Sequence, residues 1–290
     1  MKLSILIVNW NTSDLVVKCL NSILKNQPNF PFEVIVVDNA SADGSADIIT
    51  NLLGHNKRIH LIQSLRNLGF ARACNLAYKD AAGEFILLLN PDTEVREGAL
   101  DGLVNYLEAR PQTGIVGPRL LNPNGTTQPS VRRFPGIWSS MAVFSGLHRF
   151  LPLRGYLMLD FDYDRAAEVD QVMGAALLTR RSVIERIGFL DEKFWLWYEE
   201  VDFCRRVKNA GYAVEYWPGA EVMHHKGAGF SQLPVYKRKR TVARSLVYYF
   251  QKNGHVWDVW IIRLALPVIL IAAKTADYLQ KLLKIKIKPR

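Results

Sequence analysis

Short, continuous runs of large apolar residues recur in the first 90 residues, and each run stops abruptly at polar residues. Runs of this length are typical of strands covered on both faces, as in the middle of a parallel sheet. They occupy residues 3–8, 32–37, 59–62 and 85–89. Between them, apolar residues at helical spacing predict helices from Leu15 to Ile23 and over 69–81. This alternation predicts an α/β fold with a Rossmann-like, mostly parallel central sheet flanked by helices.

The second half of the chain is less regular, because prolines separate its short segments. Residues 122–125, Asn-Pro-Asn-Gly, predict a hairpin turn. Residues 128–133 predict a strand or loop that ends in two arginines, and 137–164 have too weak a period for an assignment. A strand is expected over 169–178, where Gly174 suits a bulge or the close approach of a ligand.

The last part of the chain changes in composition. Pro234–Phe250 predicts a helix with one basic face. The strongly apolar stretch Val256–Ala273 is interrupted by Asp258, Arg263 and Pro267, and its longest part without a charged residue, Leu264–Ala273, has ten residues. A spanning helix needs about 20 apolar residues, so a segment that lies on a membrane or re-enters it is favoured. The alternative is a helical hairpin that packs on the main domain.

The formal net charge of +10 is concentrated in this last part. Residues 237–290 hold 13 basic and two acidic side chains, a local charge of +11, so the first 236 residues sum to −1. A nucleic-acid enzyme would carry its charge around the site, so we expect no nucleic-acid partner. Basic and apolar residues alternate over 281–290, and such a segment attracts anionic lipid by about 1 kcal/mol per cation. We therefore expect contact with an anionic membrane surface, and expect removal of 256–290 to release the protein without unfolding it.

The cysteines and the N-terminus indicate a cytoplasmic location. The three cysteines, Cys19, Cys74 and Cys204, lie far apart without metal-ligand spacing, which is typical of free thiols in a reducing compartment. The apolar run after Met1 is too short for a signal peptide. Combined with the basic tail, these features predict a protein on the cytoplasmic face of the inner membrane, either peripheral or re-entrant.

Polar side chains follow the buried strand 85–89. Asn90-Pro91-Asp92 must end that strand, because Pro91 cannot donate to a ladder. Ligands bind at the carboxyl edge of open α/β sheets, and hard oxygen ligands there suit Mg²⁺ or Mn²⁺ carrying a substrate diphosphate. The alternative is a turn before a helix that starts near Glu97.

Two further strand ends carry candidate ligand-binding groups. Asp38 closes the second strand, where it is placed to accept hydrogen bonds from a ribose or a base edge. The alternative is that Asp38 caps the helix from Ser45. Arg66 lies at a strand-to-helix turn, where its guanidinium can meet phosphate bidentately; the alternative is a surface salt bridge. No GxGxxG follows any strand, so a dinucleotide-type phosphate loop is not expected.

Aromatic residues precede a group of acids in Trp195-Leu196-Trp197-Tyr198-Glu199-Glu200-Val201-Asp202. Acids in a first helical turn suit the helix dipole, which is the simpler interpretation of a helix continuing to Ala210. Aromatic faces also form a floor for sugar rings, and a carboxylate beside them can remove a hydroxyl proton. The predicted strand 221–227 ends in His224 and His225, a pair that can supply a nitrogen ligand to a nearby metal.

Taken in order, these motifs resemble those of family 2 glycosyltransferases, inverting enzymes with the GT-A fold, and most of all the bacterial rhamnosyltransferase-type members. The matching elements span residues 3 to about 231. They are Val8-Asn9-Trp10-Asn11, Val37-Asp38-Asn39-Ala40-Ser41 through Asp43-Gly44-Ser45, Asn67-Leu68-Gly69-Phe70 with Asn75, Asn90-Pro91-Asp92, Gly174-Ala175, Asp191-Glu192 through Glu199-Glu200-Val201-Asp202, and His224.

The resemblance implies a role for each matching residue. It implies a GT-A domain over 1–232, with a donor half to about 118 and an acceptor half to 232, followed by a basic and apolar helical segment over 233–290. Glu200 stands at the position of the catalytic base, with Asp202 as the fallback. Asp92 and His224 would bind Mg²⁺ or Mn²⁺. The donor-binding residues would be Asn9, Asp38, Asn39, Ser41, Arg66, Asn67, Asn75 and Asn90, and the acceptor residues Trp195, Trp197, Glu199 and Arg132.

The function implied is inverting transfer of a sugar from a dTDP- or UDP-linked donor to a hydroxyl of a glycan or lipid-linked acceptor, in cell-surface polysaccharide synthesis, with rhamnose as one candidate sugar. Asn90 replaces the first aspartate of the family's Asp-x-Asp motif, and Glu200 stands where aspartate is more usual. These departures leave open a nucleotide-sugar-binding or scaffold protein that has lost catalysis. UDP-N-acetylglucosamine and UDP-galactofuranose are alternative donors. A nucleotidyltransferase is disfavoured, because its glycine-rich first loop is missing after Val8.

Overall fold

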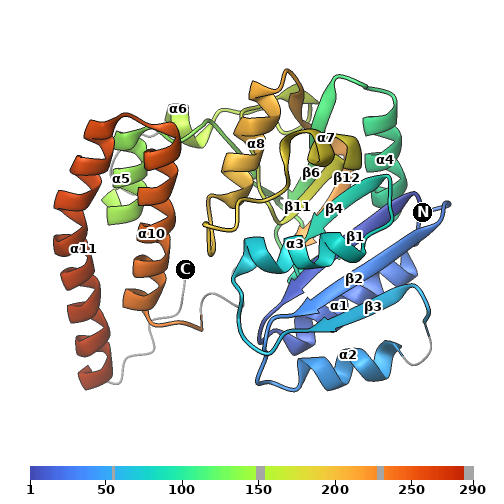
Figure 1. The fold of residues 1–290 in the computed structure, drawn as a ribbon, viewed down its shortest axis with the longest axis horizontal. Helices are drawn as coiled ribbons and strands as arrows, with labels where there is room; N and C mark the ends of the chain where they lie inside the picture. Colours follow the sequence, from blue (N-terminus) through green and yellow to red (C-terminus); the bar gives the residue numbers. More distant parts are fainter. Residues whose placement is uncertain (54–55, 148–153, 227–231, 284–290) are drawn as a thin grey trace.

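One large sheet organises the computed structural model, which describes residues 1–53, 56–147, 154–226 and 232–283 (Figure 1). Within these residues ten strands form the sheet, in the order β3-β2-β1-β4-β11-β6-β12-β5, with β7 paired to β6 and β9 paired to β12. The sheet is mostly parallel, and β11, β5, β7 and β9 run antiparallel to their neighbours. A separate two-stranded ribbon pairs β8 with β10. The fold is therefore the mixed α/β sandwich that the apolar runs predict.

The strands are β1 (Leu3–Asn9), β2 (Phe32–Asp38), β3 (Ile59–Gln63), β4 (Phe85–Leu89), β5 (Thr93–Val95), β6 (Thr113–Leu121), β7 (Thr127–Gln128), β8 (Val131–Arg132), β9 (Ala167–Glu168), β10 (Gln171–Val172), β11 (Ala176–Arg180) and β12 (Ala213–His224). The helices are α1 (Ser13–Lys25), α2 (Ser45–Leu53), α3 (Phe70–Asp80), α4 (Ala99–Glu108), α5 (Ile137–Ser145), α6 (Arg154–Leu157), α7 (Arg181–Ile187), α8 (Glu199–Asn209), α10 (Val235–Asn253) and α11 (Val256–Leu283).

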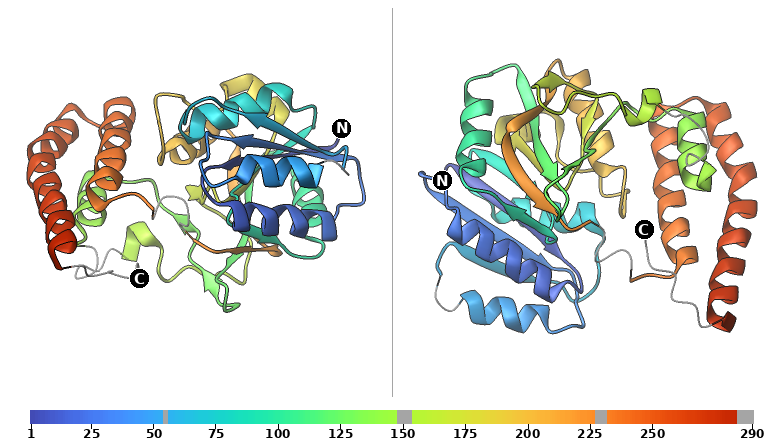
Figure 2. Two further views of the ribbon diagram at one scale, coloured as in Figure 1. Left: turned by 90° about the horizontal axis from the view of Figure 1, so that it is seen from below. Right: turned by 180° about the vertical axis from the view of Figure 1, so that it is seen from behind.

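Helices cover both faces of the sheet, as Figure 2 shows. Alternate residues of one strand enter different cores: Leu3, Ile5 and Ile7 of β1 pack with helices α1, α2 and α4, whereas Leu6 and Val8 pack with α3, α7 and α8. Because both faces are covered, the central strands are apolar at nearly every position. This double burial explains why the strands appear in the sequence as continuous apolar runs.

One strand prediction was wrong, and one strand was not predicted. The expected strand 169–178 is divided into β10 and β11, with Gly174 in the turn between them. Strand β6 lies in the region where prolines obscured the pattern, and it contains Pro118. Its partner β12 has a register shift between Trp217 and Glu221, beside the pair formed by Trp217 and Pro118. A bulge of this kind accommodates a proline that cannot donate to the ladder.

The C-terminal helices form a hairpin beside the sheet, with α10 toward the body and α11 on the outside (Figure 1). Helix α11 continues through Pro267, where the sequence suggested an interruption. Pro267 and Arg263, whose carbonyl loses its helical partner, are both exposed, so water can satisfy that carbonyl. Of the described residues, Val256–Tyr278 forms a stretch long and apolar enough to cross a membrane, judged by length and composition alone. The alternating tail predicted over 281–290 lies, beyond Leu283, outside the described residues.

The hairpin shares a core with the body. Ile262 of α11 is fully buried in a cluster that also contains Leu246 and Phe250 of α10 and Phe194 and Val201 of the body. Removal of 256–290 would expose this cluster to water. This shared core argues against the expectation that the segment can be deleted without harm to the fold.

Candidate active site

The candidate donor residues lie where three neighbouring parallel strands end. Strand β1 lies between β2 and β4, and Asn9 pairs with Asp38 at the carboxyl ends of β1 and β2. Asn90 directly follows β4. The sheet thus brings Asn9, Asp38 and Asn90 to one edge, which is where open α/β sheets bind ligands.

Hydrogen bonds order the loops that follow β1 and β2. The carboxylate of Asp38 accepts from Nδ2 of Asn9 at 2.9 Å and from the backbone N–H of Ser41 at 3.0 Å. The Ser41 hydroxyl accepts from the backbone N–H of Asn11 at 2.9 Å. Asn11 and Ala40 have φ of 52° and 62°, so both turns contain a left-handed residue. Asp38 is buried and uses two of its roughly four acceptor positions within the protein, which leaves others for a ligand.

The loop after β3 is tied to the loop after β2. Nδ2 of Asn39 donates to Oδ1 of Asn67 at 3.1 Å, and Oδ1 of Asn39 accepts from the backbone N–H of Leu68 at 2.8 Å. Asn39 and Asn67 therefore hold the two loops together. Arg66 directly precedes Asn67, and its side chain is exposed to solvent on this linked pair of loops.

Asn75 has a different role from the one expected. Its side chain donates to the carbonyl of Leu190 at 2.9 Å and accepts from the N–H of Leu190 at 3.3 Å, and Nδ2 also lies 3.1 Å from Glu192. Both ends of the amide are used to fix the segment before α8 against α3. A donor contact would require breaking these bonds, so we remove Asn75 from the donor-binding candidates.

Asp92 and His224 face each other across the β5–β12 pair. The two side chains are buried, and Nε2 of His224 lies 3.4 Å from Oδ1 of Asp92. His225 points elsewhere, since its Nε2 lies 2.6 Å from Glu94. His224 is the last residue of β12 and opposes Thr93, whereas His225 follows the strand, where its backbone N–H donates to the carbonyl of Asp92 at 2.8 Å. His224 is therefore the histidine of the pair that belongs with Asp92.

Gln128 orients the His224 ring. Nε2 of Gln128 donates to Asn122 at 3.0 Å, which turns its Oε1 toward Nδ1 of His224 at 2.7 Å. In the tautomer whose Nδ1 donates to Gln128, Nε2 presents a lone pair toward the Asp92 carboxylate. Two acceptors that face each other in a buried place suit a cation between or beside them, and a hydrogen bond from the second ring nitrogen is typical of metal-ligating histidines.

The donor set fits a divalent ion that is shared with a substrate. No group of three or more His, Cys, Asp or Glu side chains within the described residues is arranged to hold a metal. Asp92 and His224 are candidates for two ligands, and Asn90 lies two residues before Asp92 in the sequence. Mg²⁺ in nucleotide enzymes is held by one or two carboxylates with substrate phosphates and water completing the shell, which this pair matches.

Glu200 reaches the same region through Gly174. The backbone N–H of Asn90 donates to the carbonyl of Ala175 at 2.9 Å. A Cβ built on Gly174, one residue earlier, would lie 3.3 Å from Cβ of Glu200 and 3.7 Å from its carboxyl carbon. A Cβ here would make a tight contact, so glycine gives the Glu200 side chain room beside the turn. Two successive contacts connect the catalytic-base candidate to the end of β4.

Burial raises the pKa values of both glutamates that open α8. Glu199 is almost fully buried, and desolvation followed by the charge of Glu200 raises its pKa well above the ordinary value. Desolvation also raises the pKa of Glu200, although the nearby positive charge of Arg132 opposes this. Within the described residues, Oε2 of each glutamate lacks a hydrogen-bond partner. An unpaired buried carboxyl oxygen is costly unless a substrate satisfies it.

Asp202 is poorly suited to act as a second base. Its carboxylate is fully buried and lies 2.8 Å from Nε of Arg206 and 2.9 Å from Nζ of Lys252. Arg206 and Lys252 both pair with this carboxylate, so it has a structural use. Glu200 remains the better-placed base.

Trp195 and Trp197 are both exposed and lie on the segment between α7 and α8, where a sugar ring can reach them. The carbonyl of Trp195 accepts from the backbone N–H of Phe70, the first residue of α3, at 2.7 Å. Gly69 lies against the Trp195 ring. The acceptor candidates are therefore attached to the loop that carries Asn67.

A substitution at Gly69 tests this attachment. A Cβ at Gly69 would lie 2.5 Å from the carbonyl oxygen of Trp195 and 2.6 Å from its ring, at a φ of 83°. Gly44 has nearly the same φ of 80° and open space around it. We expect Gly44→Ala to lower the free energy of unfolding by about 1–2 kcal/mol through backbone strain alone. Gly69→Ala should lower it by a further ~1–3 kcal/mol through the clash. Urea unfolding measures both, and equal losses would contradict the contact.

Sequence reasoning missed two residues of this region. Gln128 was assigned only to a strand or loop, and its partner His224 is 96 residues away. Tyr156 of α6 lies in the stretch without an assignable period. The charges of Arg132 and Glu200 both act on its phenol, so it is close to the two, and burial raises its pKa. In the sequence, Tyr156 was marked only by being a polar side chain between short aromatic segments.

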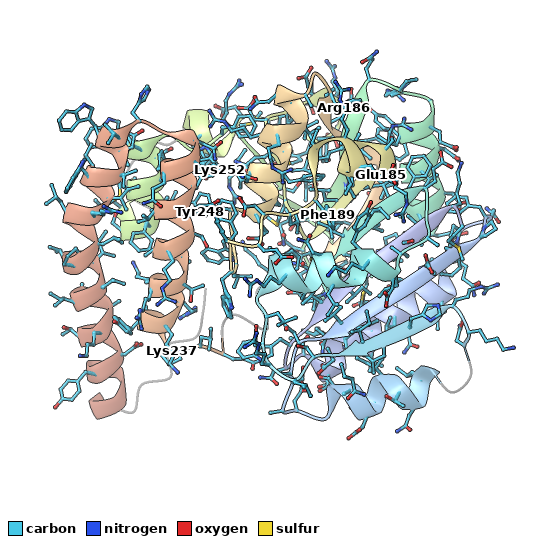
Figure 3. The ribbon with its side chains drawn as sticks, in the orientation of Figure 1. Glu185, Arg186, Phe189, Lys237, Tyr248 and Lys252 are labelled. Atoms are coloured by element: carbon cyan, nitrogen blue, oxygen red, sulfur yellow. The ribbon has the colours of Figure 1, made fainter. Side chains whose placement is uncertain are left out.

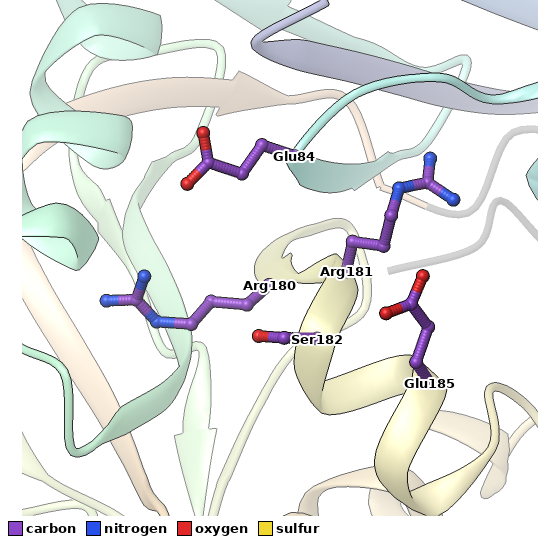
Figure 4. Close-up of a pocket in the computed structure, with 5 residues that line it drawn as sticks. All are labelled: Glu84, Arg180, Arg181, Ser182 and Glu185. Atoms are coloured by element: carbon purple, nitrogen blue, oxygen red, sulfur yellow. The ribbon is translucent and has the colours of Figure 1, made fainter.

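A surface hollow elsewhere on the molecule is not part of the candidate active site. It measures about 240 Å³ and is lined by Glu84, Arg180, Arg181, Ser182 and Glu185 (Figure 4). Glu84 directly precedes β4, so the hollow lies at the opposite end of that strand from Asn90. Its two guanidinium groups already donate to backbone carbonyls, Arg180 to Thr113 and Arg181 to Ala81 and Gly83.

Solved structures of glycosyltransferases share this fold. The mannosyltransferase PcManGT from Pyrobaculum calidifontis, solved with GDP-Man and Mn²⁺, superposes with a TM-score of 0.61 at 17% identity, over 97% of this chain and 75% of that chain. TarS residues 1–349 from S. aureus, in complex with UDP-GlcNAc, give a TM-score of 0.55 at 18% identity, over 85% and 67% of the two chains. Both likenesses concern the fold alone.

Sequence relatives point in the same direction. The N-acetylglucosaminyl-diphospho-decaprenol L-rhamnosyltransferase of Mycobacterium tuberculosis is 28% identical over 223 residues, which are 71% of this chain and 70% of that protein. The low-salt glycan biosynthesis hexosyltransferase Agl10 of Haloferax volcanii is 27% identical over 228 residues, covering 77% and 67%. The family model described as Glycosyl transferase family 2 matches residues 4–187, more than half of the chain. The chain therefore belongs to glycosyl transferase family 2.

Proposed function

We propose that this glycosyltransferase moves a single sugar, with inversion, from a dTDP- or UDP-linked donor to a hydroxyl of a lipid-linked glycan, and that a divalent cation is required. L-Rhamnose is the donor sugar that we favour, because the Mycobacterium tuberculosis relative is named for its transfer to a diphospho-decaprenol acceptor.

One arrangement carries this proposal. Asn9 and Asp38 lie at the strand ends beside Asn90, Asp92 faces His224, and Glu200 lies against Gly174 next to the same strand end. A base and a cation site near one edge of the sheet meet the two charge requirements of glycosyl transfer. A nucleotide-sugar-binding protein without catalysis, which is the alternative, would not need the unpaired buried carboxyl oxygen of Glu200.

The residues divide the work as follows. Asp38, Asn9 and Ser41 bind the nucleoside, and Arg66, Asn67 and Asn90 lie along the path to the diphosphate. Asp92 and His224 would hold the cation, which neutralises charge that develops on the leaving nucleoside diphosphate. Glu200 accepts the proton of the acceptor hydroxyl on the face opposite the leaving group. Trp195, Trp197, Glu199 and Arg132 surround that hydroxyl, with Arg132 favouring the ionised form of Glu200.

A panel of nucleotide sugars tests the proposal. Thermal unfolding of the purified protein is measured with each dTDP- and UDP-linked sugar, with and without Mn²⁺, and separate unheated samples are incubated with each donor and an N-acetylglucosaminyl-diphospho-decaprenol acceptor. A ligand present at 100 times its Kd stabilises by about 2.7 kcal/mol, which a thermal shift detects easily. We expect metal-dependent stabilisation by one donor, followed by a product one sugar heavier with inverted configuration. Stabilisation without any product would favour the binding protein instead.

The outer face of α11 supports a place at the membrane surface. Seven apolar side chains on the described part of α11 are exposed, and four of them recur every seven residues. They are Val256, Trp257, Trp260, Leu264, Val268, Ile271 and Tyr278. The opposite face, with Val259, Ile262 and Ala273, packs within the hairpin. An apolar stripe with tryptophan and tyrosine at its ends, beside a basic helix, is typical of a helix at a lipid interface.

Charges on this stripe should release the protein from lipid while leaving the fold intact. Leu264→Glu with Ile271→Glu changes only exposed positions, and burial of each side chain in lipid is worth roughly 1.5–3 kcal/mol. We expect binding to vesicles of equal phosphatidylglycerol and phosphatidylcholine to weaken by at least about tenfold. Ile48→Glu, on exposed α2, is the control and should bind as the wild type does. Co-sedimentation measures binding; an unchanged double variant would contradict the placement.

A further inference from the structure

Helix α10 contacts the body along the segment that carries the acceptor candidates. The Ser245 hydroxyl donates to the carbonyl of Leu196 at 2.8 Å, and the Tyr248 hydroxyl donates to Oδ2 of Asp191 at 2.8 Å. Figure 3 labels Tyr248 and Lys252 on the side of α10 near α8. These positions recur at intervals of three and four residues, so they share one face of the helix.

Lys252 joins the two ends of that segment. Its Nζ lies 2.8 Å from Oδ2 of Asp191 and 2.9 Å from Oδ1 of Asp202. Asp191 begins the segment, and Asp202 lies two residues after Glu200 in the first turn of α8. One cation therefore bridges two carboxylates that flank both tryptophans and both glutamates.

The segment between these carboxylates needs such support. Trp197 and Tyr198 have φ of 70° and 72°, a left-handed conformation that is strained for residues other than glycine. Strained backbone persists only where the surroundings determine it strongly. Phe194 and Val201 pack in the core that α10 forms with α11 and α5, so apolar contacts reinforce the bridge.

We propose that Lys252 is a positioning residue for sugar transfer, which holds residues 191–202 so that Trp195, Trp197 and Glu200 face the acceptor. The inference rests on the proposed function and makes helix α10 a structural part of the acceptor site. The hairpin that meets the membrane and the segment that carries the base then share one bridge and one core.

Three variants test the bridge. In Lys252→Met the aliphatic stem remains and the charge is lost; in Lys252→Arg a cation that can pair with both carboxylates is kept. Lys208→Met is the matched control, because Lys208 lies 2.7 Å from Glu168, outside the segment. We expect Lys252→Met to lower kcat roughly 10- to 100-fold with the donor KM unchanged, since small misplacements of a reacting group cost this much. Lys252→Arg should recover most of the rate, and Lys208→Met should match the wild type.

Hydrogen exchange of the unliganded proteins gives a readout independent of turnover. We expect faster exchange in Lys252→Met within the peptide that covers 191–202 and unchanged exchange in strands β1, β2 and β4. Wild-type kcat in Lys252→Met, equal impairment in Lys252→Arg, or faster exchange throughout the body would each overturn the inference. If the wild type transfers no sugar, the proposed function fails, whereas local exchange at 191–202 still decides whether Lys252 holds the segment.

Discussion

Glu200→Gln should lower kcat by roughly 10²–10⁴-fold, the usual contribution of a general base. The substitution keeps the size of the side chain and its contact with Gly174 but removes the ability to accept a proton. The donor residues Asn9, Asp38 and Asn90 are unchanged, so we expect the Kd for the nucleotide sugar to stay near that of the wild type. Transfer assays and isothermal titration measure the two quantities separately.

Glu199→Gln provides the sharpest comparison. Burial and the neighbouring charge raise the pKa of Glu199 well above its ordinary value, which favours the protonated form of its carboxyl. An amide replaces a protonated acid with little change in charge or shape. We therefore expect Glu199→Gln to lower kcat far less than Glu200→Gln does. The reverse result, with a damaging change at Glu199 and a mild one at Glu200, would move the base to Glu199.

The pH profile of kcat gives a second check on the same assignment. A base must be ionised to act, and desolvation raises the pKa of Glu200. The rate should therefore fall as pH decreases through a value above that of an ordinary glutamate. Arg132 opposes this rise, so Arg132→Gln should move the acidic limb further upward. An acidic limb at the position of a solvent-exposed glutamate would argue against a buried base.

The carboxyl edge of the sheet could be predicted because it depends on local patterns. Each apolar run identifies a strand buried on both faces, and the helices between the runs require parallel connections. Once the strands are parallel, the residues that follow them must meet at one edge. Asp38, Asn90 and Asp92 needed no knowledge of distant partners to be recognised as candidates.

The roles that sequence reasoning misjudged depend on residues far away in the chain. Asn75 is occupied by Leu190, and Asp202 is neutralised by Lys252, which lies 50 residues later. The periodicity of the sequence does not indicate either contact. Likewise, the choice between His224 and His225 depends on where β12 ends beside β5 and on which imidazole then faces Asp92. Long-range pairing of this kind has to be observed.

Asp92→Asn should abolish metal-dependent activity. Position 90 is already an amide, so this change removes the carboxylate that faces His224 and leaves the neutral imidazole as the one strong ligand of the pair. A divalent ion supplies several kcal/mol of charge stabilisation at a leaving diphosphate, which corresponds to roughly a 10³-fold loss of kcat/KM. We expect Mn²⁺ titrations in the presence of UDP or dTDP to show no saturable stabilisation of the variant.

Substitutions of the two histidines test where the cation binds. His224→Gln removes the nitrogen that lies 3.4 Å from Asp92, whereas His225→Gln changes a side chain that faces Glu94 in the same turn. If the cation binds between Asp92 and the donor diphosphate, His224→Gln should weaken Mn²⁺ binding by about 10–100-fold, as loss of an ordering ligand does, and His225→Gln should leave it unchanged. Equal effects at the two positions would mean that the histidines act only through the β5–β12 pairing. Full Mn²⁺ dependence in Asp92→Asn would place the metal elsewhere along the strand ends.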